Sequence, residues 1–273
     1  MNKLEARAIC KAYTKGQATT EVLRDINLTI NPGEFVSIVG ASGCGKTTFL
    51  RIVDGLIQPE SGEILIDDRL VIRPGQDRGF VFQADCLLPW RTVLDNVALG
   101  LELQGKDRQT SRESALPFIH LVGLQGFENS HPSELSGGMR QRANLARALV
   151  IDPKVLLMDE PFAALDAQTR EIMQQELLRI WSEQRKTVLF VTHQIEEAVY
   201  LSDRVIVFTA RPGRIKQIIT IELSRPRPFE TKHSPEFVVY VREIWHLIQE
   251  EVLTSMGMQA KQPGQSPTAA RVE

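Results

Sequence analysis

Apolar residues follow two patterns along the chain, and each pattern predicts a different kind of strand. Over residues 22–30 apolar and polar side chains alternate, which indicates a strand with one buried face. The runs 35–39, 155–158 and 187–191 are almost continuously apolar, which is typical of strands buried on both faces. Because helical periodicity separates these runs, the chain is predicted to form an α/β fold, with a mostly parallel sheet between layers of helices.

The pattern changes over residues 86–150, where β-branched runs disappear. Val93, Val97 and Leu101 repeat at the spacing of one helix face. We therefore expect an α-helical subdomain inserted at about 86–150. The β-like runs before residue 31 predict an antiparallel β-subdomain at the N-terminal side.

We expect the chain to have three parts. Residues 1–224 would form the main domain, residues 225–256 an extension with an amphipathic helix, and residues 257–273 a tail. The tail is rich in Gln, Pro, Gly and Ser, so it is predicted to be disordered.

A glycine-rich loop joins the predicted strand 35–39 to a helix predicted at 46–53. Its backbone amides suit a nucleotide phosphate, Lys46 adds positive charge, and Thr47 offers its hydroxyl to Mg²⁺. A plain turn is the alternative, but this spacing arises by chance in about one chain in a hundred of this length. The predicted nucleotide-binding residues are Gly40, Ala41, Ser42, Gly43, Cys44, Gly45, Lys46, Thr47 and Thr48.

Two acidic residues follow the apolar run 155–158. An acid at the tip of a parallel strand can reach a metal beside the glycine loop, so Asp159 is predicted to hold Mg²⁺. Adjacent residues at a strand end point to different sides, which leaves Glu160 free to polarise an attacking water. A surface role is the alternative for Glu160, and the neighbouring motifs favour the catalytic interpretation.

A second anion-binding pattern occurs near residue 136. Ser136 is suited to cap a helix predicted over 140–150, and Gly137 and Gly138 allow close backbone approach. A bare helix cap would also explain Ser136. Because one chain then carries two phosphate sites far apart in sequence, we predict that the two meet across a dimer.

The order of these motifs resembles the ATP-binding-cassette (ABC) ATPases over residues 4 to about 222. The resemblance implies a P-loop NTPase core of the RecA-like type that uses ATP and Mg²⁺. Tyr13 would stack on adenine, with plain packing as the alternative, and Gln83 would sense Mg²⁺ and water. His193 would contact the γ-phosphate, and Asp166 would touch the second copy in a head-to-tail dimer.

Two positions in the motifs are unusual. Met139 stands where the family signature usually has Gln, and a thioether donates no hydrogen bond, so a donated bond to the ribose is not expected there. Cys44 lies inside the glycine loop. Either the helix N-terminus lowers the pKa of its thiol and makes it reactive, or Cys44 serves only as a small residue.

Composition and the length of the apolar runs limit the partners and the cellular compartments that we expect for this chain. Lys plus Arg total 32 and Asp plus Glu 34, so no global field would recruit nucleic acid. No apolar run approaches the roughly 20 residues that cross a bilayer, and the N-terminal residues show no secretory signal. Three cysteines without metal-ligand spacing favour a reducing interior. We expect a peripheral protein at the cytoplasmic face of the inner membrane.

Several stretches resemble, more narrowly, the ATPase subunits of nitrate/sulfonate/taurine-type importers. They are residues 87–93, 95–97, 193–198 and 210–215, together with 235–237 and 242–245 of a late helix. The resemblance implies import of a small anionic solute through a separate membrane permease, served indirectly by a solute-binding protein. The apolar segment 87–90 either forms a groove for a permease helix or packs inside the helical subdomain.

Other functions fit the sequence less well. Export, lipid transport or a non-transport role is the alternative within the family. A chromosome-type ATPase needs a long coiled coil, which the span 83–136 is too short to hold. A GTPase needs Asn-Lys-x-Asp after a late strand, and the near match at residues 2–5 precedes the loop and ends in Glu.

Overall fold

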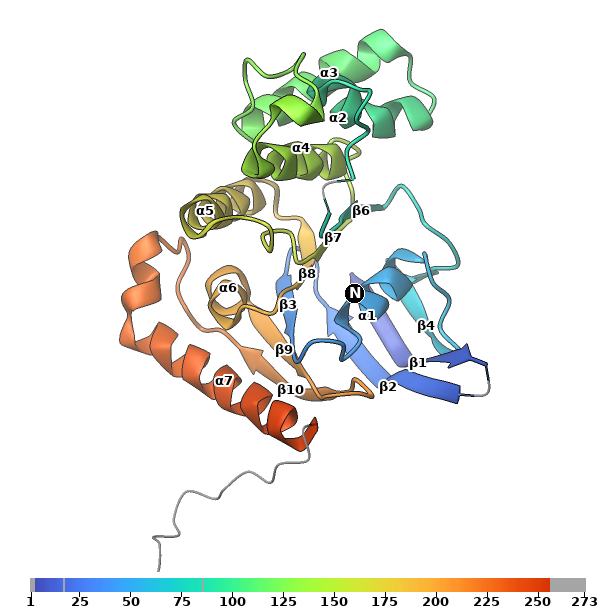
Figure 1. The fold of residues 1–273 in the computed structure, drawn as a ribbon, viewed down its shortest axis with the longest axis vertical. Helices are drawn as coiled ribbons and strands as arrows, with labels where there is room; N and C mark the ends of the chain where they lie inside the picture. The colour runs from blue at the N-terminus through green and yellow to red at the C-terminus, as the bar shows by residue number, and fades with distance from the viewer. Residues whose placement is uncertain (1–2, 17, 85, 256–273) are drawn as a thin grey trace, which may run out of the picture.

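A six-stranded sheet lies at the centre of the computed structural model, which describes residues 3–16, 18–84 and 86–255 (Figure 1). The predicted disordered tail, 257–273, lies outside the described residues. The strands follow the order β10-β9-β3-β8-β7-β6. All neighbouring pairs run parallel except β9 and β10, which confirms the predicted mostly parallel sheet. The strands are β3 Phe35–Val39, β6 Arg78–Val81, β7 Val155–Asp159, β8 Thr187–Val191, β9 Arg204–Phe208 and β10 Ile215–Thr220.

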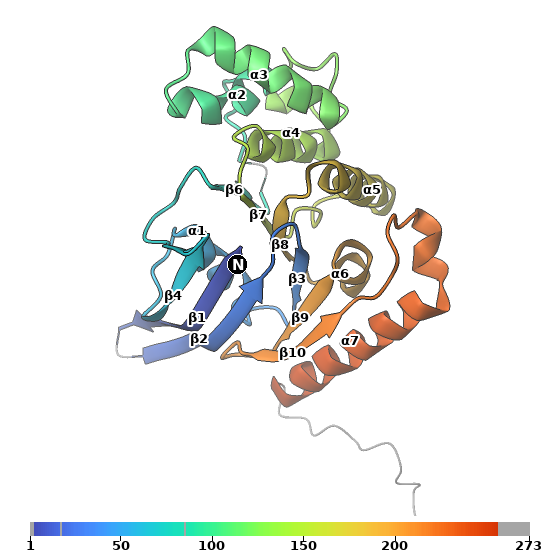
Figure 2. The ribbon, with the colours of Figure 1, turned by 180° about the vertical axis from the view of Figure 1, so that it is seen from behind.

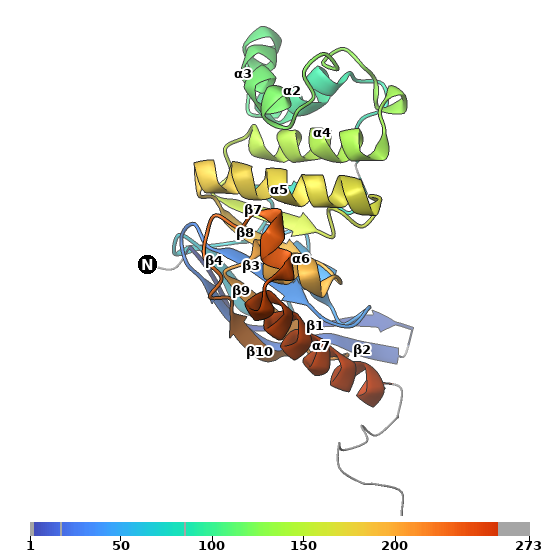
Figure 3. The ribbon, with the colours of Figure 1, turned by 90° about the vertical axis from the view of Figure 1, so that its left-hand side faces the viewer.

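Helices cover both faces of this sheet, and a further group lies beyond its β6 edge (Figures 1 and 3). α1 separates the sheet from the N-terminal strands, whereas α5, α6 and α7 lie on the other side (Figure 2). The group at the β6 edge consists of α2, α3 and α4. The helices are α1 Lys46–Asp54, α2 Val93–Leu103, α3 Arg108–Leu121, α4 Gly137–Leu149, α5 Ala167–Gln184, α6 Ile195–Leu201 and α7 Pro235–Ser255, with short 3-10 helices η1 Pro132–Glu134 and η2 Phe229–His233.

Strand β7 shows why the apolar runs are continuous. Successive side chains of a strand point to opposite faces of the sheet. Val155 and Leu157 belong to the core cluster that also contains α1 residues. Leu156 and Met158 belong to the second cluster, which includes residues of α4, α5 and α6. Each face of the sheet is therefore buried, and no position along the strand is left for a solvated side chain.

The N-terminal strands form a second, antiparallel sheet in the order β2-β1-β4-β5, which confirms the predicted β-subdomain. In β2 the buried residues Ile26, Leu28 and Ile30 alternate with exposed ones, as the sequence pattern predicted. The strands of this sheet are β1 Leu4–Lys15, β2 Ala18–Ile30, β4 Ser61–Ile66 and β5 Arg69–Leu70.

The C-terminal helix packs against the main sheet. Phe237 and Ile244 of α7 are buried in the core cluster that contains residues of β9. Lys216 of β10 pairs with Glu250 and Glu251 at 2.9 and 2.8 Å. We therefore propose that the extension folds together with the main domain. Among the described residues, no helix is both long enough and apolar enough to cross a membrane.

Candidate functional site

The glycine loop between β3 and α1 has a backbone that only glycine adopts easily. Gly43 and Gly45 have φ angles of 75° and 106°, in the left-handed region that disfavours side chains. A Cβ on Gly45 would also lie 2.7 Å from Cδ2 of Leu23. In the described part of the chain no side chain caps the first turn of α1, and that turn carries no acidic residue. Its amides are therefore open to an anion.

Lys46 lies buried inside this loop, with 5% of its surface exposed. Its Nζ donates to the carbonyl oxygens of Gly40 and Ala41 at 2.9 and 3.2 Å. No ion pair with a carboxylate occurs at Lys46 among the described residues. Neutral carbonyls compensate an ammonium charge only in part, so phosphate oxygens would be better acceptors.

Thr47 and Asp159 meet where α1 begins and β7 ends. Thr47 Oγ1 donates to Asp159 Oδ1 at 2.9 Å. Burial raises the pKa of the Asp159 carboxyl, the charge of Glu160 raises it further, and the Thr47 hydrogen bond opposes both effects.

The donors at this point fit Mg²⁺, which prefers oxygen ligands and usually keeps phosphate and water oxygens in its shell. Thr47 and Asp159 each supply one such oxygen. No cluster of three or more His, Cys, Asp or Glu side chains suited to a metal is found in the described ranges. We infer that the metal would arrive with the nucleotide.

Glu160, Gln83 and His193 come together although they lie on three different segments. Glu160 Oε2 lies 3.0 Å from His193 Nδ1 and 3.5 Å from Gln83 Nε2. The backbone of Glu160 has a φ of 45°, which non-glycine residues rarely adopt, and its amide donates to the Val191 carbonyl at 2.9 Å.

A cavity of about 550 Å³ lies over the loop and reaches Glu160 and Gln83. Its volume is in the usual range for small-molecule sites. Tyr13 belongs to its lining, whereas Gly40, Ala41, Cys44, Asp159 and His193 do not. The lining residues are Tyr13, Lys15, Thr20, Val22, Ser42, Gly43, Gly45, Lys46, Thr47, Thr48, Gln83, Glu160 and Arg211.

Arg211 is the most informative lining residue that the motif analysis did not assign. It lies between β9 and β10, and its Nη2 and Nε donate to the Gly43 carbonyl at 3.1 and 3.3 Å. The guanidinium therefore adds positive charge beside the phosphate loop. The only signal in the sequence was its place in the importer-like stretch 210–215. Lys15, Thr20 and Val22 had no signal at all.

Ser136 does not join this cavity. It is exposed and caps α4, with its Oγ accepting from the Met139 amide at 3.3 Å. Gly137 is also exposed, and a Cβ on Gly138 would lie 2.7 Å from Cγ2 of Thr169. Asp166 caps α5 by accepting from the Thr169 amide at 3.0 Å. The start of α4 thus lies against the start of α5, apart from the chain's own phosphate loop.

The structure also separates the alternatives for two further features. Cys44 is 1% exposed, and burial raises the pKa of its thiol, which favours the small-residue role over a reactive thiol. In the segment 87–90, Leu87 is buried in the core, whereas Trp90 is 73% exposed. Leu87 therefore contributes to the core, and Trp90 remains exposed at the surface.

The parallel sheet and the glycine loop at the start of α1 define a P-loop NTPase. Compared with known families, residues 23–163 match the family described as ABC transporter. The chain belongs to this family, and it is an ATPase.

Relatives cover nearly the whole chain. An uncharacterized ABC transporter ATP-binding protein of Methanocaldococcus jannaschii is 52% identical over 93% of this chain and 94% of its own. A nitrate import ATP-binding protein of Synechocystis sp. is 44% identical over 90% and 95%. An aliphatic sulfonates import ATP-binding protein of Bacillus thuringiensis is 47% identical over 80% and 86%.

A solved structure supports the fold. It is a dimeric ATP-binding cassette in a post-hydrolysis state, bound to ADP and Pi. It superposes with a TM-score of 0.73 at 35% identity, covering 81% of this chain and 100% of that one. This likeness confirms the predicted P-loop NTPase fold.

Proposed function

We propose that the chain is the ATP-hydrolysing subunit that powers import of a small anionic solute, of the nitrate or sulfonate type, through a separate membrane permease. The observation that carries the hydrolytic part is the contact of Glu160 with Gln83 and His193 at the phosphate-loop cavity. The importer part is supported by the nitrate and aliphatic sulfonate import proteins among the relatives.

In the proposed reaction Glu160 accepts a hydrogen bond from a water molecule and orients it toward the γ-phosphorus. As the water oxygen bonds to the γ-phosphorus, the bond between that phosphorus and the β,γ-bridging oxygen breaks. The products are ADP, inorganic phosphate and a proton. Gln83 and His193 hold the Glu160 carboxylate in position. Lys46 exchanges its carbonyl acceptors for phosphate oxygens and offsets their charge.

Mg²⁺, held by Thr47, Asp159 and Gln83, would supply charge neutralisation at the phosphates. Burial raises the pKa of Asp159, and a nearby cation favours the ionised carboxylate. Asp159 is thus better suited to hold a metal than to stand alone as a buried charge.

A second copy, arranged head to tail, completes each site in this proposal. Ser136 and the Gly138 amide of one chain would meet the γ-phosphate held by the other, and Asp166 would lie at the same contact. The support is that Ser136 is exposed at a helix N-terminus and outside its own chain's cavity. The solved relative named above is dimeric.

The permease contact would lie at the exposed Trp90. This residue is in the segment that follows Gln83, so a permease helix docked there would act close to the catalytic group. Large exposed aromatic side chains are common anchors at protein interfaces. Leu87 of the same segment is buried, so a displacement of the segment by the permease would also shift a side chain in the core.

The experiment is copurification of a tagged copy with its permease, followed by reconstitution into vesicles. We expect ATP-driven uptake of nitrate, an aliphatic sulfonate or taurine, with a matched Lys46→Ala complex as the inactive control. ATP-driven movement in the export direction would contradict the importer assignment. Hydrolysis that no permease or anion stimulates would contradict the transport assignment as a whole.

A further inference from the structure

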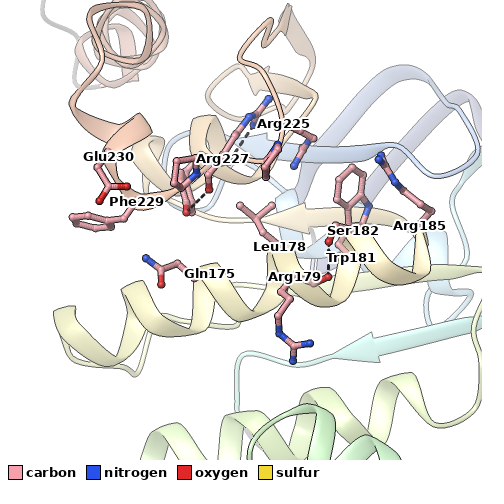
Figure 4. Close-up of a pocket in the computed structure, with 13 residues that line it drawn as sticks. Gln175, Leu178, Arg179, Trp181, Ser182, Arg185, Arg225, Arg227, Phe229 and Glu230 are labelled. Atoms are coloured by element: carbon pink, nitrogen blue, oxygen red, sulfur yellow. Dashed lines mark hydrogen bonds between the residues drawn. The ribbon is translucent and has the colours of Figure 1, made fainter.

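A second cavity, of about 740 Å³, lies between the C-terminal half of α5 and the segment that leads into η2 (Figure 4). It shares no lining residue with the phosphate-loop cavity. Its size suits a small organic molecule. Leu178, Trp181, Tyr200 and Phe229 make much of its lining apolar.

The same lining carries an excess of positive charge. It holds one carboxylate, Glu230, and four arginines, two of which lie against one aromatic ring. The guanidinium carbons of Arg185 and Arg225 lie 4.8 and 4.1 Å from the centroid of the Trp181 ring. Arg225 pairs with Asp203 at 2.8 Å, whereas Arg185 forms no ion pair in the described part of the chain.

Arg227, which also lines the cavity, is a buried cation with 6% of its surface exposed. Its hydrogen bonds go to backbone carbonyls, including those of Tyr200 and Ser202 at the end of α6, and none goes to a carboxylate of the described residues. Burial, followed by repulsion from Arg225, lowers the pKa of Arg227 to about 10. Burial also lowers the pKa of Arg225; the pairing with Asp203 opposes this effect, and the weaker repulsion from Arg185 adds to it. Among the described residues, Arg185 and Arg227 therefore have no carboxylate partner, whereas Arg179 pairs with Glu176 and Glu183.

We propose that this cavity binds a small organic anion, whose charged group pairs with Arg185 and Arg225 and whose apolar body packs against Leu178 and Phe229. An inorganic ion would leave the apolar lining unused. A neutral molecule would leave the repulsion between the arginines in place. An anionic head on an apolar body satisfies both features.

A chain of hydrogen bonds, buried over most of its length, links this region to Thr192, the residue before His193. Lys232 Nζ, in η2, donates to Gln174 Oε1 at 2.8 Å, and Gln174 Nε2 donates to Glu197 Oε1 at 3.1 Å. Glu197 Oε2 accepts from Thr192 Oγ1 at 2.6 Å. Thr192 immediately precedes His193. A ligand that draws η2 toward α5 changes this chain, so occupancy of the cavity alters the rate of hydrolysis; this second step rests on the proposed function.

The test titrates the full chain, saturated with ADP to fill the nucleotide cavity, with anilinonaphthalene sulfonate. This probe is an aromatic anion that fluoresces in apolar surroundings. We expect one saturable site per chain, and about tenfold weaker binding to Arg185→Asn. Asparagine suits that position because Arg185 has a φ of 49°.

Two matched variants control this experiment. Arg185→Lys retains the charge and should retain most of the affinity, while Arg69→Glu, on the exposed strand β5, should bind as the wild type does. Equal affinity of the wild type and Arg185→Asn, with both folded by circular dichroism, would overturn the site. So would several weak sites per chain.

The rate of ATP hydrolysis, with and without the probe, tests the coupling separately. We expect the probe to change the rate in the wild type and not in Lys232→Met, which should still bind the probe. A bound probe with no effect on the wild-type rate would overturn the coupling. An inactive chain that binds the probe with the expected charge dependence would contradict the proposed function and support the site.

Discussion

Two parts of the molecule carry groups suited to phosphate, and they are built in different ways. Around the glycine loop, Lys46, Asp159 and Glu160 are already held by contacts within the chain. Ser136, in contrast, is exposed at the start of α4, and among the described residues its side chain bonds only within its own helix cap. The difference indicates that folding alone prepares the first part, and that the second part becomes useful when another chain approaches.

The largest effect is expected from Glu160→Gln, in the first part. The amide is close in shape to the carboxylate but is a poor proton acceptor, so hydrolysis should fall by at least about a hundredfold. ATP binding should be retained, because Glu160 is not among the groups that would hold the phosphates. Phosphate release and nucleotide affinity would measure the two effects, and size-exclusion chromatography with ATP should show a trapped dimer. Near-normal phosphate release would refute the role of Glu160.

The next prediction tests whether the two parts belong to different chains. Lys46→Ala should remove charge from the phosphate loop, and Ser136→Arg should place a bulky cation at the start of α4. Each variant alone should lose most of its ATPase activity. Mixed in equal amounts, they should form heterodimers in which one of the two composite sites is intact.

Random pairing of these variants gives about a quarter of the wild-type number of intact sites. ATPase activity of the mixture should therefore exceed that of either variant alone. Heterodimers of the double variant Lys46→Ala/Ser136→Arg with the wild type, isolated through two different affinity tags, are the matched control, since they also keep one substituted loop and one substituted helix start but have no intact site. A mixture no more active than its two components would show that the parts do not combine across chains.

The sequence predicted the strands around the first part more accurately than the helix that begins the second part. The strands 35–39 and 187–191 were predicted with the bounds found, because burial on both faces leaves a signal within the strand itself. The helix expected at 140–150 begins earlier, at Gly137, because the Ser136 cap overrides the low helix propensity of two glycines. Short elements such as α6 carried too few turns for a periodicity.

Cavity residues that lie outside the sequence motifs could not be predicted. Arg211 reaches Gly43 across 168 positions of sequence, and that contact exists only because β9 lies beside β3. The left-handed backbone of Glu160 likewise has no sequence signal, since it depends on a hydrogen bond to Val191 in the neighbouring strand. Motifs thus identified the groups that suit phosphate, whereas tertiary contacts decide which other groups surround them.

A smaller effect is expected from the thiols, which report on how closed the phosphate-loop part is. Cys44 is buried with a raised pKa, whereas Cys86 is exposed. Native Cys44 should therefore react with iodoacetamide at least about tenfold more slowly than Cys86. Peptide mass spectrometry at timed intervals would give both rates, with the unfolded chain as the control in which they converge. Comparable rates in the folded chain would show that the loop opens readily.

The smallest effect is expected from Met139→Gln, which changes the second part, at the start of α4. Met139 is half-buried and packs against the main core, so a glutamine there should cost about 1 kcal/mol in the free energy of unfolding. Its amide also adds a donor at the exposed helix start, which should lower the KM for ATP by no more than about threefold, since an exposed hydrogen bond contributes little. Denaturant unfolding and steady-state kinetics would measure these two changes, with Met139→Leu as the control that preserves packing and adds no donor. A tenfold or larger change in KM, absent from Met139→Leu, would mean that position 139 contacts the nucleotide and that the start of α4 is more fully prepared for it than the exposed Ser136 indicates.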